Sequence, residues 1–255
     1  MAAASEALVL RERHGDVMLV TLNRPAQRNA LRYESWSALA GVLSEAVNDS
    51  NVRGVVIAGA GGFFCAGGDL KSGPAHGSGP LAPAARVEHA QRVMEQFRAM
   101  PVPTVAAVEG AAVGLGWSLA LSCDLVVAAS DAFFSAPFVA RAVVPDGGLA
   151  WRLTQQLGRH RASALLLRGT RLPAFEAQHV GLVTDVVEPG SAVTRAEQLA
   201  ADIARSDAGA VEMTKRLINS AEAAQLAAFH PLELAMATVA QQRSASGEAR
   251  GQWSR

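Results

Sequence analysis

The sequence predicts an α/β fold that ends in a helical C-terminal region. Short apolar runs typical of buried strands alternate with amphipathic helical patterns along most of the 255-residue chain. Two of these runs lead directly into glycine-rich turns, and from about Thr194 onward only helical patterns remain. We therefore predict a core at residues 1–193 and a helical oligomerisation region at residues 194–255.

The N-terminal elements follow from their periodicity and from the residues that stop each pattern. Residues 16–22 alternate as a strand does, and Pro25 ends them. Apolar residues at helical spacing predict a helix at 34–48, and a buried strand follows at 54–58. Glycine, proline and serine dominate residues 72–83, which predicts a mobile loop.

The later elements alternate in the same way before the helical region begins. Residues 86–100 have a helical pattern that Pro101 and Pro103 stop. The other expected elements are strands at 104–108, 124–129 and 183–187, and helices at 115–121, 194–204, 208–228 and after Pro231. Apolar side chains in the last helices should be buried, either against the core or against another subunit.

Composition excludes several classes of partner. Lysine plus arginine equals aspartate plus glutamate at 23 each, so nothing indicates binding to nucleic acid or to an anionic membrane surface. Cys65 and Cys123 stand in apolar surroundings, which indicates buried thiols in a reducing compartment and no metal site. Without a secretory signal pattern or a membrane-length apolar run, we expect a cytoplasmic protein.

The two glycine-rich turns are the strongest indication of function. Residues 62–70 follow one strand and residues 109–118 follow another. Glycine lets backbone N–H groups approach a ligand, and two such turns side by side can form an oxyanion hole. A dinucleotide fold is the rival interpretation, but each Gly-x-Gly lacks the third glycine of that motif. The glycines can also serve tight turns alone.

Several motifs in order resemble the crotonase, or enoyl-CoA hydratase/isomerase, superfamily. The matching stretches are residues 22–25, 29–31, 64–70, 103–110, 119–124, 157–159, 176–177, 181–183 and 215–219. The resemblance implies a spiral of ββα units whose helical C-terminal region packs into homotrimers or hexamers. It also implies an acyl-CoA thioester substrate, with coenzyme A as part of the substrate and no other cofactor.

The resemblance implies a reaction in which negative charge develops on the thioester oxygen of the substrate. The two backbone N–H groups of the oxyanion hole fall on Gly68 and Leu115, where they would stabilise an enolate. Matching positions for substrate and coenzyme A are Arg28, Ala30, Ala66, Asp69, Leu70 and Lys71. The two cations can meet coenzyme A phosphates or be ordinary solvated charges, and Asp69 is expected to tie the turn through backbone hydrogen bonds.

The sequence departs from the pattern of a hydratase. In the family, hydration is served by two glutamates, but Ser118 and Phe138 stand at those positions here. Neither side chain is a useful base. Trp117, Ser118 and Phe138, together with Trp151, can instead line an apolar acyl pocket, although core packing is the commoner fate of such aromatics.

Asp146 is the remaining candidate base. It matches a stretch where isomerase branches of the family carry an acidic residue facing the acyl chain. It can move a proton between two carbons, or it can simply cap the helix that begins near Gly148. We therefore expect an enoyl-CoA isomerase, with an atypical hydratase and a non-catalytic acyl-CoA-binding relative as the alternatives.

Overall fold

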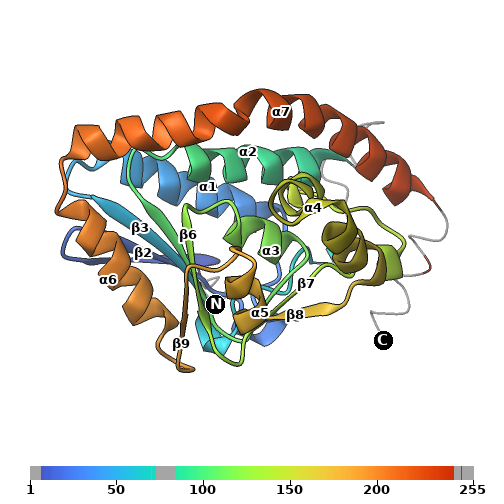
Figure 1. Ribbon diagram of the computed structural model, residues 1–255, viewed down its shortest axis with the longest axis horizontal. Coiled ribbons are helices and arrows are strands. Elements are labelled where there is room, and N and C mark those ends of the chain that lie inside the picture. Colours follow the sequence, from blue (N-terminus) through green and yellow to red (C-terminus); the bar gives the residue numbers. More distant parts are fainter. Residues whose placement is uncertain (1–6, 70, 73–83, 244–247, 249–255) are drawn as a thin grey trace, which may run out of the picture.

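A six-stranded sheet forms the centre of the protein in the computed structural model, which describes residues 7–69, 71–72, 84–243 and 248 (Figure 1). Its strands are β1 (Val9–His14), β2 (Val17–Leu22), β3 (Gly54–Gly59), β4 (Thr104–Val108), β6 (Leu125–Ala129) and β9 (Asp185–Val187), hydrogen-bonded in that order. Only β1 runs antiparallel to its neighbour. The α/β class is confirmed, while Leu70 and residues 73–83 of the expected loop lie outside the described residues.

A smaller second sheet gives the fold its repeated ββα pattern. It contains β5 (Ala111–Val113), β7 (Phe133–Ser135) and β8 (Arg171–Pro173). The chain runs from β4 through β5 to helix α3 (Leu115–Ala120), and from β6 through β7 to α4 (Leu149–Arg168). Isolated bridges from Cys65 to Ala112 and from Leu31 to Gly68 continue this second layer toward the N-terminus.

Helices cover both faces of the large sheet (Figure 1). On one side, α1 (Tyr33–Asn48) and α2 (Ala85–Ala99) share a core with alternate strand residues such as Val55 and Ile57. On the other, α6 (Ala192–Ala204) packs alanines against the intervening residues, such as Val56. The remaining short helices are α5 (Ala174–His179) and 3-10 turns at Pro25–Gln27, Ala60–Gly62 and Val139–Arg141.

Sequence periodicity missed β1, β5, β7 and β8 for two reasons. In β1 only Val9 is buried, and the residues that follow are mostly charged and exposed, so no apolar alternation exists to detect. The other three strands contain three residues each, which is too short for any period. They are defined by their pairing partners instead.

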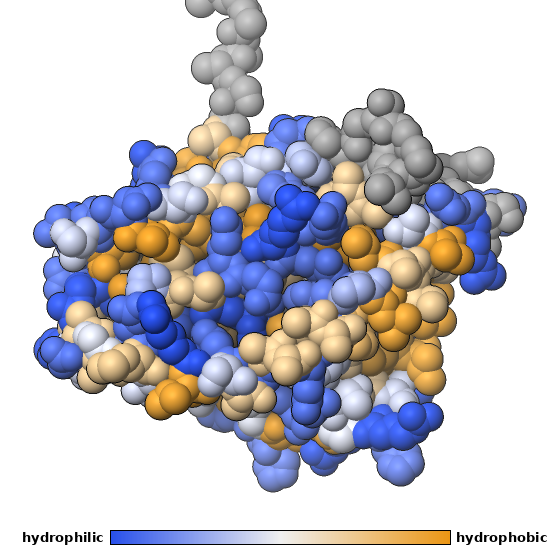
Figure 2. Space-filling model, turned by 90° about the horizontal axis from the view of Figure 1, so that it is seen from above, coloured by the Kyte–Doolittle hydropathy of each residue, from blue (hydrophilic) through white to orange (hydrophobic). Residues whose placement is uncertain are grey.

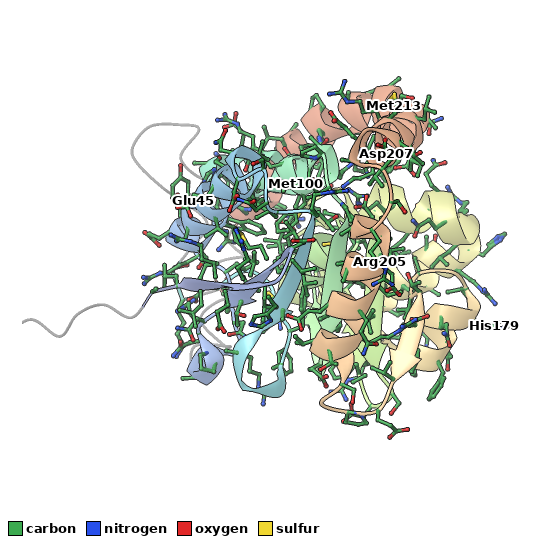
Figure 3. All side chains as sticks on the ribbon, turned by 90° about the vertical axis from the view of Figure 1, so that its left-hand side faces the viewer. Glu45, Met100, His179, Arg205, Asp207 and Met213 are labelled. Carbon is green, nitrogen blue, oxygen red and sulfur yellow. The ribbon has the colours of Figure 1, made fainter. Side chains whose placement is uncertain are left out.

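The break expected at Pro231 is wrong. Helix α7 (Ala208–Gln242) continues through Pro231 without interruption, and Figure 1 shows it as one bent ribbon along the molecule. A proline inside a helix removes one hydrogen bond and costs about 3 kcal/mol. Burial on both sides of the proline offsets this cost, because Leu226, Glu233 and Ala237 all face the interior. Asp207 caps the start of the helix through Ala210 N–H at 2.8 Å (Figure 3).

The outer side of α7 carries exposed apolar side chains, which are Met213, Leu217, Ile218, Leu232, Met236 and Val239. Figure 2, seen from this side of the molecule, shows hydrophobic patches separated by polar residues. None of the helices in the described part of the chain combines the length and apolar character that a membrane span requires.

Candidate active site

The two glycine turns lie in direct contact with each other. Cys65 N–H donates to Ala111 O at 3.1 Å, and Val113 N–H donates back to Cys65 O at 2.9 Å. A Cβ at Gly116 would lie 2.5 Å from Cys65 O, and one at Gly67 would lie 2.6 Å from Val113 O. Only glycine therefore permits this approach at both positions.

This contact places the predicted oxyanion-hole residues in adjacent turns. Leu115 is the first residue of α3, after Gly114, which has a positive φ of 55°, so the Leu115 N–H has no acceptor within the helix. A Cβ at Gly67 would be 3.4 Å from Leu115 N, which brings the neighbouring Gly68 close to α3. Within the described residues, neither Gly68 N–H nor Leu115 N–H donates to a protein acceptor. Both are available for a ligand oxygen.

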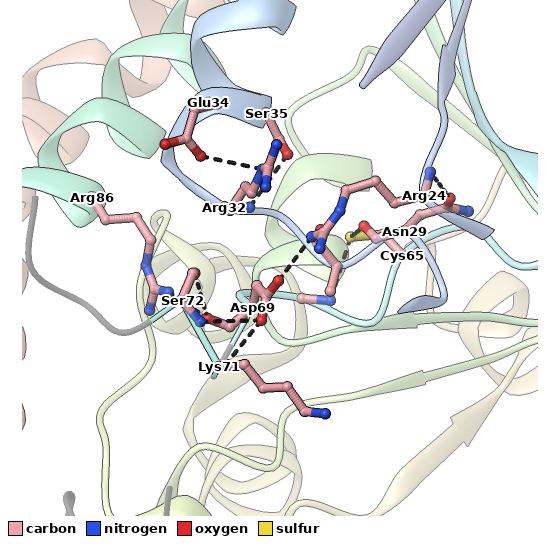
Figure 4. A network of polar contacts seen from close by, with 12 residues as sticks. Arg24, Asn29, Arg32, Glu34, Ser35, Cys65, Asp69, Lys71, Ser72 and Arg86 are labelled. Atoms are coloured by element: carbon pink, nitrogen blue, oxygen red, sulfur yellow. Dashed lines mark hydrogen bonds and ion pairs between the residues drawn. The ribbon is translucent and has the colours of Figure 1, made fainter. Parts of the chain in front are cut away.

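Asp69 organises the first turn (Figure 4). Arg24 Nη1 donates to its carboxylate at 2.9 Å, and Lys71 N–H and Ser72 N–H donate to the other oxygen at 2.9 and 3.4 Å. Burial acts to raise the pKa of Asp69, but these hydrogen bonds and the charge of Arg24 outweigh it and hold the pKa below its ordinary value. The carboxylate thus ties the turn together, as the sequence suggested.

The segments assigned to coenzyme A lie side by side. Ala66 N–H donates to Arg28 O at 2.9 Å, and Leu31 N–H donates to Gly67 O at 2.8 Å, just after Ala30. Arg28 is exposed in a left-handed conformation, with its guanidinium 5.5 Å from the centre of the Phe63 ring.

Lys71 is also exposed, while Leu70 lies outside the described residues. Arg28 and Lys71 are thus exposed cations on segments that adjoin the first glycine turn.

Both cysteines are free thiols, as expected. Cys65 is buried between the turns, and Cys123 is half-buried. Burial raises the pKa of Cys65 to about 12, so it stays a neutral thiol at physiological pH.

Asp146 is a buried carboxyl group without a full set of partners. It is 6% exposed, and among the residues that the structure describes its Oδ1 has no hydrogen-bond partner. The N-cap interpretation is wrong. Gly148 is the N-cap of α4, no side chain of its own segment caps the helix, and Gly148 N–H donates to Glu233 instead.

The pKa of Asp146 is raised from an ordinary value of 3.8 to about 7. Burial is the largest cause, the negative charge of Glu233 adds to it, and the positive charge of Arg86 opposes both. A carboxyl group with a pKa near neutrality can both accept and return a proton at physiological pH.

Helix α3 links Asp146 to the oxyanion-hole residues. Ser118 Oγ donates to Asp146 O at 2.9 Å, and a Cβ at Gly147 would lie 2.8 Å from Ser118 Cβ. Ser118 follows Leu115 by three residues on the helix, about 4.5 Å along its axis. The hydroxyl of Ser118 therefore positions the Asp146 segment beside the start of α3.

The predicted pocket aromatics have different surroundings. Trp117 is fully buried, with its ring centroid 5.6 Å from that of Phe134. The ring of Phe138 lies 3.5 Å from the position of a Cβ on Gly114, directly against the turn that precedes Leu115. Of the three predicted aromatics, Phe138 has the clearest contact with the candidate site, while Trp151 is buried on α4.

Sequence analysis missed two buried charged residues at this site. Arg86 on α2 donates from Nη1 to Asp69 O at 3.0 Å, and its Nη2 would be 3.4 Å from a Cβ on Gly68. At the start of a helix, it resembled an ordinary solvated charge. Glu233 had a detectable signal, since it stands seven residues from both Leu226 and Ala240, on the buried stripe of α7.

Comparison with known proteins gives matches over nearly the whole chain. Residues 12–252 match the enoyl-CoA hydratase/isomerase family model. A 1,2-epoxyphenylacetyl-CoA isomerase from Escherichia coli K12 is 36% identical over 81% of this chain and 79% of its own length. A 2,3-dehydroadipyl-CoA hydratase from the same strain is 35% identical over 88% and 86%. The crystal structure of an enoyl-CoA hydratase from Mycobacterium avium subsp. paratuberculosis K-10 superposes with a TM-score of 0.87, at 30% identity over 98% and 100%.

Proposed function

This chain belongs to the enoyl-CoA hydratase/isomerase family, and we propose that within it the protein is an enoyl-CoA double-bond isomerase. The observation that carries the proposal is the buried Asp146 carboxyl, whose Oδ1 lacks a partner within the described residues and whose pKa is raised to about 7. The two positions at which a hydratase of this family has glutamates hold Ser118 and Phe138.

The proposed reaction needs only one base and the oxyanion hole. The Asp146 carboxylate takes a proton from C2 of a 3-enoyl-CoA, and the electron pair of the broken C–H bond delocalises onto the thioester oxygen. The N–H groups of Gly68 and Leu115 donate to that oxygen, each worth about 3 kcal/mol in the transition state. Asp146, now protonated, returns the proton to C4, which gives the 2-enoyl-CoA. Base and substrate end the cycle with the protons they started with.

Two observations favour isomerisation over hydration. Ser118 Oγ already donates to Asp146 O and is not basic, so it does not replace a water-activating glutamate. Phe138 presents an apolar ring to the Gly114 turn and has no group that could activate water.

The non-catalytic alternative is disfavoured on physical grounds. A buried carboxyl oxygen without a hydrogen-bond partner costs stability, and such cost is typical of functional sites. A protein that only bound acyl-CoA would gain nothing from Asp146.

Substrate binding and assembly complete the proposal. The exposed Arg28 and Lys71 provide charges for the phosphates of coenzyme A, and Phe138 borders the acyl chain. The exposed apolar side chains of α7, such as Leu217 and Met236, support a homotrimer or hexamer.

A panel of CoA thioesters tests the proposed activity. The protein is incubated with 2-enoyl-, 3-enoyl- and ring-bearing substrates, and products are followed by absorbance and mass. We expect 3-enoyl-CoA to be consumed without a mass change, because isomerisation adds no water. Gly68→Pro removes one donor and should lower the rate by about 100-fold or more, while Gly68→Ala, which keeps the N–H, is the control. A gain of one water as the dominant reaction would contradict the proposal.

A further inference from the structure

Glu233 is a buried carboxylate without an ion-pair partner among the described residues. It is 4% exposed on α7, and its carboxylate accepts hydrogen bonds from Gly148 N–H at 2.9 Å and from Gln91 Nε2 at 2.8 Å. These donors come from α4 and α2, so one side chain joins three helices. Burial raises the pKa of Glu233, and these neutral donors at a helix start oppose that shift because they stabilise the ionised carboxylate.

The bonds of Glu233 hold the turn that carries Asp146. Gly147 and Gly148 both have left-handed conformations, with φ of +68° and +75°. Helix α4 begins directly after them and has no capping side chain of its own. Glu233 therefore binds the backbone N–H of the N-cap residue, Gly148, from a distant part of the chain.

Neighbouring helices enclose the same turn from both sides. A Cβ at Gly147 would lie 2.7 Å from Met94 Sδ on α2, and a Cβ at Gly148 would lie 3.5 Å from Leu226 Cδ1 on α7. The turn next to Asp146 is therefore packed between α2 and α7 and hydrogen-bonded to Glu233.

Four charged or titratable groups act around this turn. Arg86 comes from α2, Arg152 from α4, and His230 and Glu233 from α7. Glu233 is the negative one, and after burial its charge is the second cause of the raised pKa of Asp146. Arg86 opposes it, and Arg152 acts on Glu233 itself.

We propose that Glu233 is a positioning residue for Asp146: it clamps the Gly147–Gly148 turn and sets a negative charge behind the catalytic carboxyl. The proposal rests on the proposed function of Asp146. It makes α7 part of the active site of its own chain, in addition to any role in assembly. Glu233 acts through Asp146 and touches no substrate atom.

The decisive variant is Glu233→Gln, which keeps the shape of the side chain and removes its charge. With the like charge gone, the Asp146 carboxylate is easier to form, so the acidic limb of the kcat/KM profile should move toward lower pH by about one unit. The matched control is Glu222→Gln on the same helix, where the carboxylate binds Arg98 at 2.9 Å and is 40% exposed. Its profile should equal that of the wild type. An unshifted profile in Glu233→Gln overturns the proposal, even if the rate falls.

Glu233→Asp covers the case in which Glu233→Gln does not fold. It keeps the charge but withdraws the carboxylate from Gly148 by one methylene, so we expect kcat to fall about 10-fold or more with KM unchanged. Wild-type kcat in this variant overturns the proposal on its own.

A measurement without substrate separates this proposal from the proposed function. In the ligand-free protein, the infrared C=O band of a protonated carboxylic acid is followed against pH, and its loss in Asp146→Asn identifies the Asp146 band. The band should disappear at a lower pH in Glu233→Gln than in the wild type, whatever the substrate is. Equal titrations overturn the proposal, whereas a shifted band without isomerase activity counts only against the proposed function.

Discussion

Replacing Asp146 with asparagine should change how stability depends on pH. The folded protein holds the Asp146 proton up to about pH 7, whereas the unfolded chain releases it near 3.8. Between these values the folded state binds more protons, so the free energy of unfolding falls as the pH rises through this window. Across the whole window the free energy of unfolding falls by about 4 kcal/mol, of which about 3 kcal/mol is lost between pH 5 and pH 8.

Asparagine has the same shape and no proton to lose, so Asp146→Asn should be more stable than the wild type at pH 8. The stability of Asp146→Asn relative to the wild type should be about 3 kcal/mol greater at pH 8 than at pH 5, which corresponds to roughly 6 to 12 °C in Tm for a chain of this size. Denaturant unfolding and thermal scans at both pH values measure it.

An exposed aspartate provides the control for this experiment. Asp131→Asn makes the same chemical change at the surface and should leave the pH dependence of the wild type intact. Parallel stability curves for wild type and Asp146→Asn would refute the reasoning, because they would mean that the carboxyl group titrates alike in the folded and unfolded states.

Two further variants and one measurement on the wild type test the packing around the site and the assembly of the protein. Gly116→Ala places a methyl group 2.5 Å from Cys65 O, so it should lower the free energy of unfolding by about 1 to 3 kcal/mol and also lower turnover. Denaturant unfolding measures the first effect, and wild-type values for both would contradict the contact between the turns. Glu109 accepts hydrogen bonds from Gly190 N–H and Ala192 N–H at 3.0 and 2.9 Å at the start of α6. Glu109→Ala should therefore lower the free energy of unfolding by about 1 kcal/mol and leave kcat unchanged, whereas a large loss of kcat would show a catalytic role. Light scattering should give a trimer or hexamer, and a monomer at working concentration would remove the role assigned to the outer side of α7.

The glycine turns could be predicted from the sequence because their requirement is local. Gly67 has a φ of +91°, which favours glycine at that point, and Gly116 lies where any side chain would collide with Cys65. Each turn also follows an apolar strand whose length and composition are visible in the chain. Strand, turn and helix start are therefore visible in the sequence, whereas the assignment of the two N–H groups to Gly68 and Leu115 comes from the resemblance to the family.

The surroundings of Asp146 could not be predicted in the same way, because they come from distant parts of the chain. Ser118 reaches it from α3, and Glu233 reaches its turn from α7. Nothing next to Asp146 in sequence distinguishes a helix cap from a buried base. The helix through Pro231 has the same explanation, since long-range burial overrides a strong local preference.

The most direct test of the account compares two reactions in two proteins. Initial rates of 3-enoyl-CoA isomerisation and 2-enoyl-CoA hydration are measured for the wild type and for Asp146→Asn, with CoA thioester binding followed by calorimetry. The account predicts that the wild type isomerises faster than it hydrates, and that Asp146→Asn loses 10²- to 10⁴-fold in isomerisation while it still binds the thioester. Full isomerase activity in Asp146→Asn, or faster hydration by the wild type, would contradict it.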